Sequence, residues 1–145
     1  MASPDKKTKT PSLDDFPLHT FDKLRYADTD RQGHVNNAVF STFLETGRAE
    51  FLYDPENPLT AERASFVIAD LSLQFVSEIT WPGRVEVGTG VTKVGTSSLH
   101  LYQGLFQDGR CVATADTVIV QMDELSRKSS PLPEKTREFL GRYKI

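Results

Sequence analysis

The apolar side chains of Asn36–Tyr53 recur every three or four positions, which is the spacing of an amphipathic helix. The residues on this apolar face are Phe40, Phe43, Leu44, Gly47 and Phe51. A glycine on that face lowers helix propensity, on the order of 1 kcal/mol, so we expect a strand to pass close to Gly47. The loop Asp54–Arg63 should end the helix, because proline disfavours helical geometry in the residue before it.

Extended stretches, several of them alternating apolar and polar side chains, come after the helix and predict four strands. These strands are Ala64–Ile79, Arg84–Val94, Ser98–Gln107 and Arg110–Met122. Short turns separate them, and Asp108-Gly109 is a strong hairpin signal. An earlier strand is predicted at Leu18–Ala27, and a short helix should begin at Pro133 and end near Tyr143. This order predicts an α+β domain in which one curled antiparallel sheet covers a long central helix.

The N-terminal segment differs in composition from the rest of the chain. Residues 1–16 are polar and contain Pro4 and Pro11, so we expect a disordered segment with nothing to bury. Residues 17–145 are long enough for one domain with one hydrophobic core. The N-terminus has no apolar signal core, which favours a cytoplasmic protein.

Charge and cysteine content exclude several function classes. The formal net charge is −3 and no basic stripe is present, which argues against nucleic-acid binding. No apolar run approaches the roughly 18 residues of a membrane span. The single cysteine, Cys111, cannot form an internal disulfide, and no Cys/His cluster has zinc spacing. We therefore predict no metal and no membrane or nucleic-acid partner.

The candidate chemistry lies in Arg25–Leu52, where Asp30 comes a few residues before the predicted helix. Helix N-termini present unpaired N–H groups and a partial positive charge, so they favour anions and developing oxyanions. Gly33 permits a tight turn that would bring the Asp30 carboxylate back towards this terminus. A carboxylate beside an oxyanion site indicates acyl-transfer chemistry. The alternative is that Asp30 only forms the turn.

Residues next to Asp30 have both chemical and structural interpretations. His34 could orient the carboxylate, bind substrate or donate a proton, or it could be structural. Asn36 and Asn37 are candidate helix caps. The backbone N–H of Asn37 is the better candidate for an oxyanion donor, because it needs only position. Further along the helix, Glu45 precedes Arg48 by three residues, a spacing typical of a surface ion pair.

Two polar segments later in the chain could contact a ligand. Ser97 and Ser98 have no nucleophile motif around them and are interpreted as turn residues that could hydrogen-bond near the site. Arg127 and Lys128 follow the last strand. They could bind a phosphate, although a charged pair in a loop is usually only solvated.

The segment RYADTDRQGHVNNAVFSTFLETGRAEFL resembles the signature of hotdog-fold acyl-CoA thioesterases of the 4-hydroxybenzoyl-CoA thioesterase-like group. It is also similar to plant acyl-ACP thioesterases, in which a D-x-x-x-H-V-N-N run occurs. The resemblance extends over about Phe21 to Leu140 and includes V-x-x-V-G-x-S-S at Val91–Ser98 and R-K-S-S-P-L-P at Arg127–Pro133. It implies a hotdog fold around the long helix. It also implies a homodimer or homotetramer with its sites at the dimer interface.

The resemblance also implies roles for single residues. Asp30 would be the nucleophile or general base, and the Asn37 N–H would polarise the thioester carbonyl. His34 matches a catalytic histidine of the plant enzymes, whereas Gln32 stands where those enzymes have asparagine. The residues expected to contact substrate are Gly33, Asn36, Phe40, Ser97, Ser98, Arg127 and Lys128, the last two at the CoA nucleotide.

The predicted function is therefore hydrolysis of an acyl-CoA thioester, with CoA as part of the substrate and no separate cofactor. The H-F-P-G context of hotdog dehydratases is absent, which argues against a hydratase. Two alternatives stay open: an acyl-ACP thioesterase, and a hotdog module that binds or senses acyl-CoA without turnover. Asp30 favours the enzyme, because a binding module needs no carboxylate beside an oxyanion site.

Overall fold

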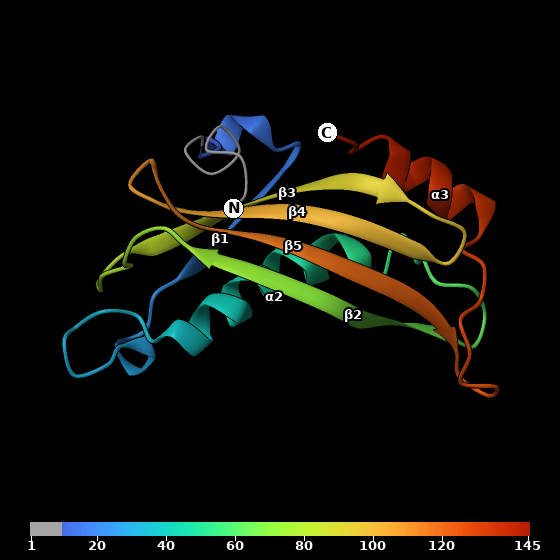
Figure 1. Cartoon of the computed structure of the whole chain (residues 1–145), viewed down its shortest axis with the longest axis horizontal. Helices are drawn as coiled ribbons and strands as arrows, with labels where there is room; N and C mark the ends of the chain where they lie inside the picture. Colours follow the sequence, from blue (N-terminus) through green and yellow to red (C-terminus); the bar gives the residue numbers. More distant parts are fainter. Residues whose placement is uncertain (1–9) are drawn as a thin grey trace, which may run out of the picture.

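The computed structural model describes residues 10–145 of the chain. Its helices and strands, in chain order, are η1 (Leu13–Asp15), β1 (Leu18–Lys23), η2 (Tyr26–Asp28), α2 (Asn37–Leu52), β2 (Ala64–Phe75), β3 (Arg84–Val94), β4 (Ser98–Gln107), β5 (Arg110–Asp123) and α3 (Glu134–Gly141) (Figure 1). The long helix and the four long strands predicted from the apolar pattern are confirmed. Within residues 10–145, no helix is both long enough and apolar enough to cross a membrane.

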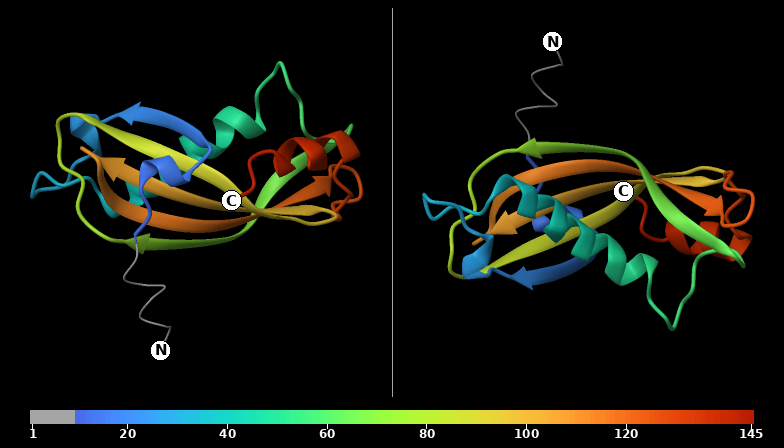
Figure 2. Two further views of the ribbon diagram at one scale, coloured as in Figure 1. Left: turned by 90° about the horizontal axis from the view of Figure 1, so that it is seen from above. Right: turned by 90° about the horizontal axis from the view of Figure 1, so that it is seen from below.

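The five strands form one curved antiparallel sheet in the order β1-β3-β4-β5-β2. Helix α2 lies across one face of this sheet and packs against β1, β3 and β4 (Figure 2). Strand β2 is one edge of this sheet, and β1 is the other. A curved antiparallel sheet around one long helix is the predicted α+β hotdog fold, which is confirmed.

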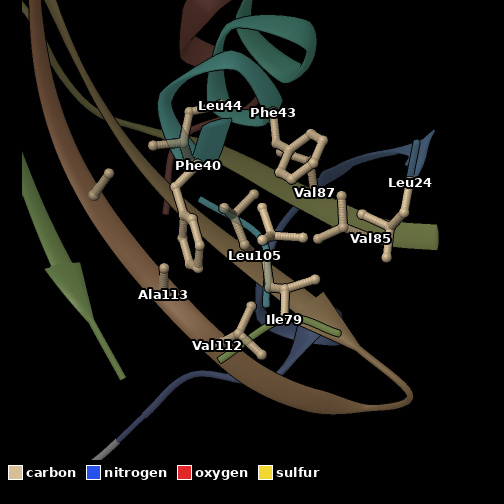
Figure 3. Close-up of a cluster of buried hydrophobic side chains, with 12 residues drawn as sticks. Leu24, Phe40, Phe43, Leu44, Ile79, Val85, Val87, Leu105, Val112 and Ala113 are labelled. Atoms are coloured by element: carbon tan, nitrogen blue, oxygen red, sulfur yellow. The ribbon is translucent and has the colours of Figure 1, made fainter. Parts of the chain in front are cut away.

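Two clusters form the core, and the one nearer the site lies between the N-terminal half of α2 and the sheet (Figure 3). Phe43 and Leu44 of α2 are almost fully buried there, and each such burial stabilises the fold by roughly 1.5–3 kcal/mol. A Cβ atom at Gly47 would lie 2.6 Å from Val87 Cγ1 and 2.9 Å from Gln103 Nε2. The expected close approach of a strand to Gly47 is therefore confirmed, and it explains why this position has no side chain.

The opposite face of the sheet is covered by the two ends of the described chain. Phe16 is buried, and a Cβ atom at Gly88 would lie 2.6 Å from its ring. Ile145 packs in the same way over Gly90. The prediction of disorder through residue 16 is wrong for Leu13–Phe16, because a polar composition does not reveal a single aromatic anchor. Residues 1–9 lie outside the described residues.

Two predicted strands end earlier than the pattern suggested. The strand predicted at Leu18–Ala27 stops at Lys23, and Tyr26–Asp28 forms a 3₁₀ turn instead. The strand predicted through Ile79 stops at Phe75, because the backbone N–H groups of Val76 and Ser77 both donate to the carbonyl of Val112, at 2.9 and 3.1 Å. The chain then turns towards the segment that precedes α2.

Candidate active site

A cavity of about 390 Å³ lies where the N-terminus of α2 meets the segment that follows β2. Its polar lining comes from Asp30, Gln32, His34, Asn37, Ser77 and Glu78, and its apolar lining from Val35, Phe40, Phe75 and Val76. Four of the predicted site residues therefore share one cavity. Gly33 and Asn36 are not among the lining residues. Gly33 shapes the turn through its backbone, and Asn36 caps α2 with its side chain.

Asp30 lies in a tight turn that presents its carboxylate at the cavity. The backbone of Asp30 donates to the His34 carbonyl at 2.8 Å, and its own carbonyl accepts from Gly33 N–H at 3.1 Å. Carboxylate Oδ1 accepts from the N–H groups of Gln32 and His34, at 2.8 and 3.3 Å. Gly33 has a φ of +79°, which favours glycine. The turn binds Oδ1 and leaves Oδ2 for a ligand or a water molecule.

Asp28 has a structural role, although it lies only two residues before Asp30. Its buried carboxylate accepts from the backbone N–H and the guanidinium of Arg25, and its carbonyl accepts from Asn36 N–H at 2.8 Å. Burial opposes ionisation, but the bonds and charge of Arg25 outweigh it and lower the pKa of Asp28. Asp28 thus fixes the loop to the start of α2.

The start of α2 provides a free N–H beside the carboxylate. The predicted cap at Asn36 is confirmed, because its side-chain oxygen accepts from Ala38 N–H at 3.0 Å. Asn37 is the first helical residue, so its own N–H has no acceptor one turn earlier. The partial positive charge of the helix end adds to this donor. A carbonyl oxygen that enters the cavity can therefore accept a hydrogen bond from Asn37.

His34 is paired with a carboxylate that sequence reasoning missed. His34 Nε2 lies 3.4 Å from Glu78 Oε2, and the two backbones meet through a bridge between His34 and Thr80. Glu78 was assigned to the interior of a predicted strand. The break in alternation at the adjacent apolar residues Phe75 and Val76 was the available signal. Glu78 is thus placed to fix the orientation of the His34 ring.

Two aromatic rings form the apolar wall of the cavity. The rings of Phe40 on α2 and Phe75 on β2 pack edge to face, with centroids 5.0 Å apart. Phe40 is buried, whereas Phe75 is exposed in this single chain. Phe40, predicted on the apolar face of the helix, lines this cavity, and its contact with substrate stays a prediction.

The other predicted binding residues lie at the far end of the sheet. Ser97 and Ser98 form the β3–β4 turn, and their carbonyls accept from Gln121 and Gly95. Arg127 and Lys128 belong to the loop after β5, where Lys128 bonds back to Asp123. Strand β5 runs about 33 Å from Ala113, beside the cavity, to Asp123. Within one subunit, the two serines, Arg127 and Lys128 therefore do not line the Asp30 cavity.

Other reactive groups do not form a second reaction centre in the part of the chain that is described. Cys111 is half-buried, and burial raises the pKa of its thiol, which disfavours a nucleophilic thiolate. Within residues 10–145, no three metal-binding side chains cluster. A reaction without a metal stays a prediction.

Comparisons with known proteins agree with the fold. The family model described as Thioesterase-like superfamily matches residues 24–140. Acyl-CoA thioester hydrolase YbgC from Escherichia coli is 27% identical over 116 residues, which cover 77% of this chain and 87% of YbgC. A predicted thioesterase from Bacillus stearothermophilus is 28% identical with a TM-score of 0.80, covering 88% of this chain and 96% of its own.

A thioesterase from Thermus thermophilus, solved in complex with coenzyme A and Zn, is also 28% identical. Its TM-score is 0.75, and the match covers 86% of this chain and 98% of that one. The region that the family model matches contains the turn and the helix that line the cavity, together with all four long strands of the sheet. The chain belongs to the thioesterase-like superfamily.

Proposed function

We propose that this protein hydrolyses an acyl-CoA thioester to a free acid and CoA. The observation that carries the proposal is that the Asp30 carboxylate and the first N–H of α2 line the same cavity. The names of its relatives support the substrate class, because YbgC is an acyl-CoA thioester hydrolase and the Thermus enzyme was solved with CoA.

In the proposed reaction, the thioester carbonyl oxygen accepts from Asn37 N–H, and the helix terminus stabilises the negative charge that develops on it. Asp30 then acts in one of two ways. Its carboxylate attacks the carbonyl carbon, expels the CoA thiolate and leaves an anhydride that water hydrolyses. Alternatively, it takes a proton from a water molecule, which attacks the carbon and expels the thiolate. Both routes need an ionised Asp30.

His34 would supply a proton to the departing thiolate. Its Nε2 lies 3.4 Å from Glu78 Oε2, and a carboxylate partner fixes the orientation of an imidazole. Glu78 would therefore be a positioning residue for His34.

The proposal includes a homodimer that pairs two β2 edges. Strand β2 is an edge strand with exposed apolar side chains, including Ile68, Leu71 and Phe75, and such an edge is a template for pairing with another chain. Two antiparallel copies related by a two-fold axis would place the Ala64 end of one β2 beside the Phe75 end of the other. The partner subunit's Arg127 and Lys128 would then approach the Asp30 cavity and could bind the CoA phosphates.

A thioester hydrolysis screen tests the proposed function. The substrates are short, long, branched and aromatic acyl-CoAs, each paired with the matching acyl-ACP, and the readout is release of the free thiol. The expected result is turnover of CoA thioesters in preference to ACP thioesters. Turnover of acyl-ACP alone would identify an acyl-ACP thioesterase, and tight binding of acyl-CoA with no turnover would identify a binding module.

The proposed role of Arg127 and Lys128 in binding CoA can be tested separately. Replacing Arg127 and Lys128 together by Gln should raise KM for acyl-CoA roughly 10-fold or more with little change in kcat, because charged hydrogen bonds to phosphate contribute about 1.5–3 kcal/mol each. Lys135→Gln, on the exposed side of α3, is the matched control and should leave KM unchanged. An unchanged KM in the double variant would remove this loop from the proposed CoA site.

A further inference from the structure

A buried guanidinium lies halfway along the groove between α2 and β2. Arg48 of α2 is only 6% exposed. Its one hydrogen bond among residues 10–145 is long, from Nη1 to Gln103 Oε1 at 3.5 Å. The surface ion pair predicted with Glu45 is wrong, because Glu45 is exposed and forms no ion pair with Arg48. Burial lowers the pKa of Arg48, and the charge of nearby Glu45 only partly opposes this effect.

A buried hydroxyl near Arg48 also lacks a partner. Within the described residues, Thr117 Oγ1 on β5 is the buried side-chain atom with no hydrogen bond. Thr117 pairs with Leu101, two residues before Gln103 on β4, so Thr117 and Gln103 are diagonal neighbours on the face that α2 covers. The side-chain N–H groups of Gln103 already have partners, because Nε2 donates to the Leu44 carbonyl and to Thr89 Oγ1, each at 3.0 Å. Buried polar groups normally have partners.

Arg48 lines a small cavity with largely apolar walls. It has a volume of about 80 Å³, its apolar lining includes Leu52, Phe66, Ile68 and Ile119, and its polar lining comes from Arg48, Glu45 and Tyr53. Ile119 follows Thr117 by two positions on the same face of β5. Arg48 is the cation in this lining, and its buried guanidinium forms no ion pair with the exposed Glu45, so it can bind the negative end of an amphipathic ligand.

An apolar surface connects this cavity with the Asp30 cavity. Phe75 packs against Phe40 in the Asp30 cavity, Leu73 packs on the core beneath α2, and Ile68 lines the Arg48 cavity. Leu71 lies between them on the same strand and is exposed, as are Phe75 and Ile68. Because α2 packs towards β1, β3 and β4, this stripe of β2 is open in the single chain. Edge pairing in the proposed homodimer uses the β2 backbone, so these side chains can still contact a hydrocarbon chain.

We propose that the Arg48 cavity holds the far end of the acyl group and that Arg48 recognises a carboxylate there, so that the preferred substrates are CoA thioesters of dicarboxylic acids. The inference rests on the proposed hydrolysis at Asp30. A carboxylate matches the fork of guanidinium N–H groups in two parallel bonds. An acyl chain with an apolar end would leave the buried charge of Arg48 without a partner, which is unfavourable.

The spacing of the two cavities sets the length of the acyl chain. Asn37 and Arg48 are separated by about 16 Å along the helix axis, and the Arg48 side chain points back towards Asn37, which shortens the span to about 11–16 Å. An extended chain advances about 1.2 Å per bond, so this span corresponds to roughly nine to thirteen carbons.

The experiment compares two series of CoA thioesters, fatty acyl chains and dicarboxylic acyl chains of equal length. The wild-type protein should favour the dicarboxylic series in kcat/KM by roughly 10- to 100-fold, with the largest ratio at roughly nine to thirteen carbons. Arg48→Met, which keeps the length of the side chain and removes its charge, should abolish this preference and retain turnover of fatty acyl-CoA. Arg142→Met, at an exposed arginine, is the matched control and should keep the preference.

The outcomes separate this inference from the proposed function. Equal rates on both series in the wild-type protein would overturn the role of Arg48 and leave hydrolysis at Asp30 standing. A changed oligomeric state in Arg48→Met with an unchanged preference would also overturn it, because Arg48 would then serve the subunit interface. If Arg48→Met does not fold, Arg48→Lys should lower the ratio, since ammonium keeps the charge without the fork.

A complete absence of hydrolysis would contradict the proposed function instead. Titration calorimetry with the free dicarboxylic acids then tests whether Arg48 binds a carboxylate. Binding to the wild-type protein that weakens roughly 10-fold or more in Arg48→Met would support the carboxylate site. Equal binding, or none, would overturn it.

Discussion

Four polar residues around the start of α2 have different roles because their surroundings differ. Asp28 is buried and bonded to Arg25, so its carboxylate serves the loop. Asp30 is exposed at the cavity and retains a free oxygen. Asn36 caps the helix with its side chain, whereas Asn37 offers its backbone N–H. The two aspartates differ in role, and so do the two asparagines. Because each pair has the same residue type, position along the chain determines the role.

Two variants of Asn37 separate its backbone from its side chain. Asn37→Ala keeps the N–H and should retain kcat within a few-fold. Asn37→Pro removes the N–H and should lower kcat about 100- to 1,000-fold, the usual loss of one oxyanion donor. Proline is favoured at the first helical position, and Asn36 already has the extended conformation (ψ 138°) that a following proline requires.

The measurement is steady-state acyl-CoA hydrolysis, with circular dichroism to verify that the helix is intact in both variants. Equal losses in Asn37→Ala and Asn37→Pro would assign the effect to the side-chain amide and remove the backbone N–H from the proposed mechanism.

At the scale of elements, the apolar period of α2 and the series of extended strands could be predicted from the sequence, because periodicity reports which face of an element is buried. Contacts between residues far apart in the sequence could not be predicted in this way. Glu78 reaches His34 only because β2 ends at Phe75. Arg48 looked solvated because Glu45 precedes it, although its place four residues after the buried Leu44 was a signal for burial. Asp30 was predictable because turn, cap and helix are all local.

The close packing of α2 on the sheet can be tested at Gly47. Gly47→Ala should destabilise the fold despite a gain in helix propensity of about 1 kcal/mol, because the new Cβ would lie 2.6 Å from Val87 Cγ1. Overpacking of this kind typically costs about 1–3 kcal/mol. Thermal unfolding should therefore show a lower Tm for Gly47→Ala.

Gly141 provides the matched control, because a Cβ atom there would meet nothing within 4 Å. Gly141→Ala should have an unchanged or higher Tm. A Gly47→Ala variant as stable as the wild-type protein would mean that α2 and the sheet can separate readily.

At the scale of the whole molecule, the predicted site residues divide between two ends of the sheet. Asp30 and Asn37 lie at one end, and Arg127 and Lys128 lie about 33 Å away along β5. If two β2 edges pair in antiparallel fashion, Asp30 and Asn37 of one subunit would lie near Arg127 and Lys128 of the partner subunit. The homodimer and its shared site are therefore one proposal, and loss of the dimer should also impair activity.

A charge on the β2 edge tests this assembly. Leu71→Asp should shift the protein from dimer to monomer in light scattering and lower kcat/KM, because inward charges block edge pairing. Phe21→Asp is the control on β1, the opposite edge, where Phe21 is exposed and lies beside Arg84. A dimer that survives in Leu71→Asp and dissociates in Phe21→Asp would place the interface on β1.

The central claim is that Asp30 performs thioester hydrolysis at the N-terminus of α2. The most direct test is the kcat of Asp30→Asn on the best acyl-CoA, measured by thiol release, with CoA affinity measured on the same sample. Asparagine retains an Oδ1 acceptor for Gln32 and His34, so the turn should persist. The account predicts loss of hydrolysis with CoA affinity within a few-fold of wild type, whereas full activity of Asp30→Asn would contradict it.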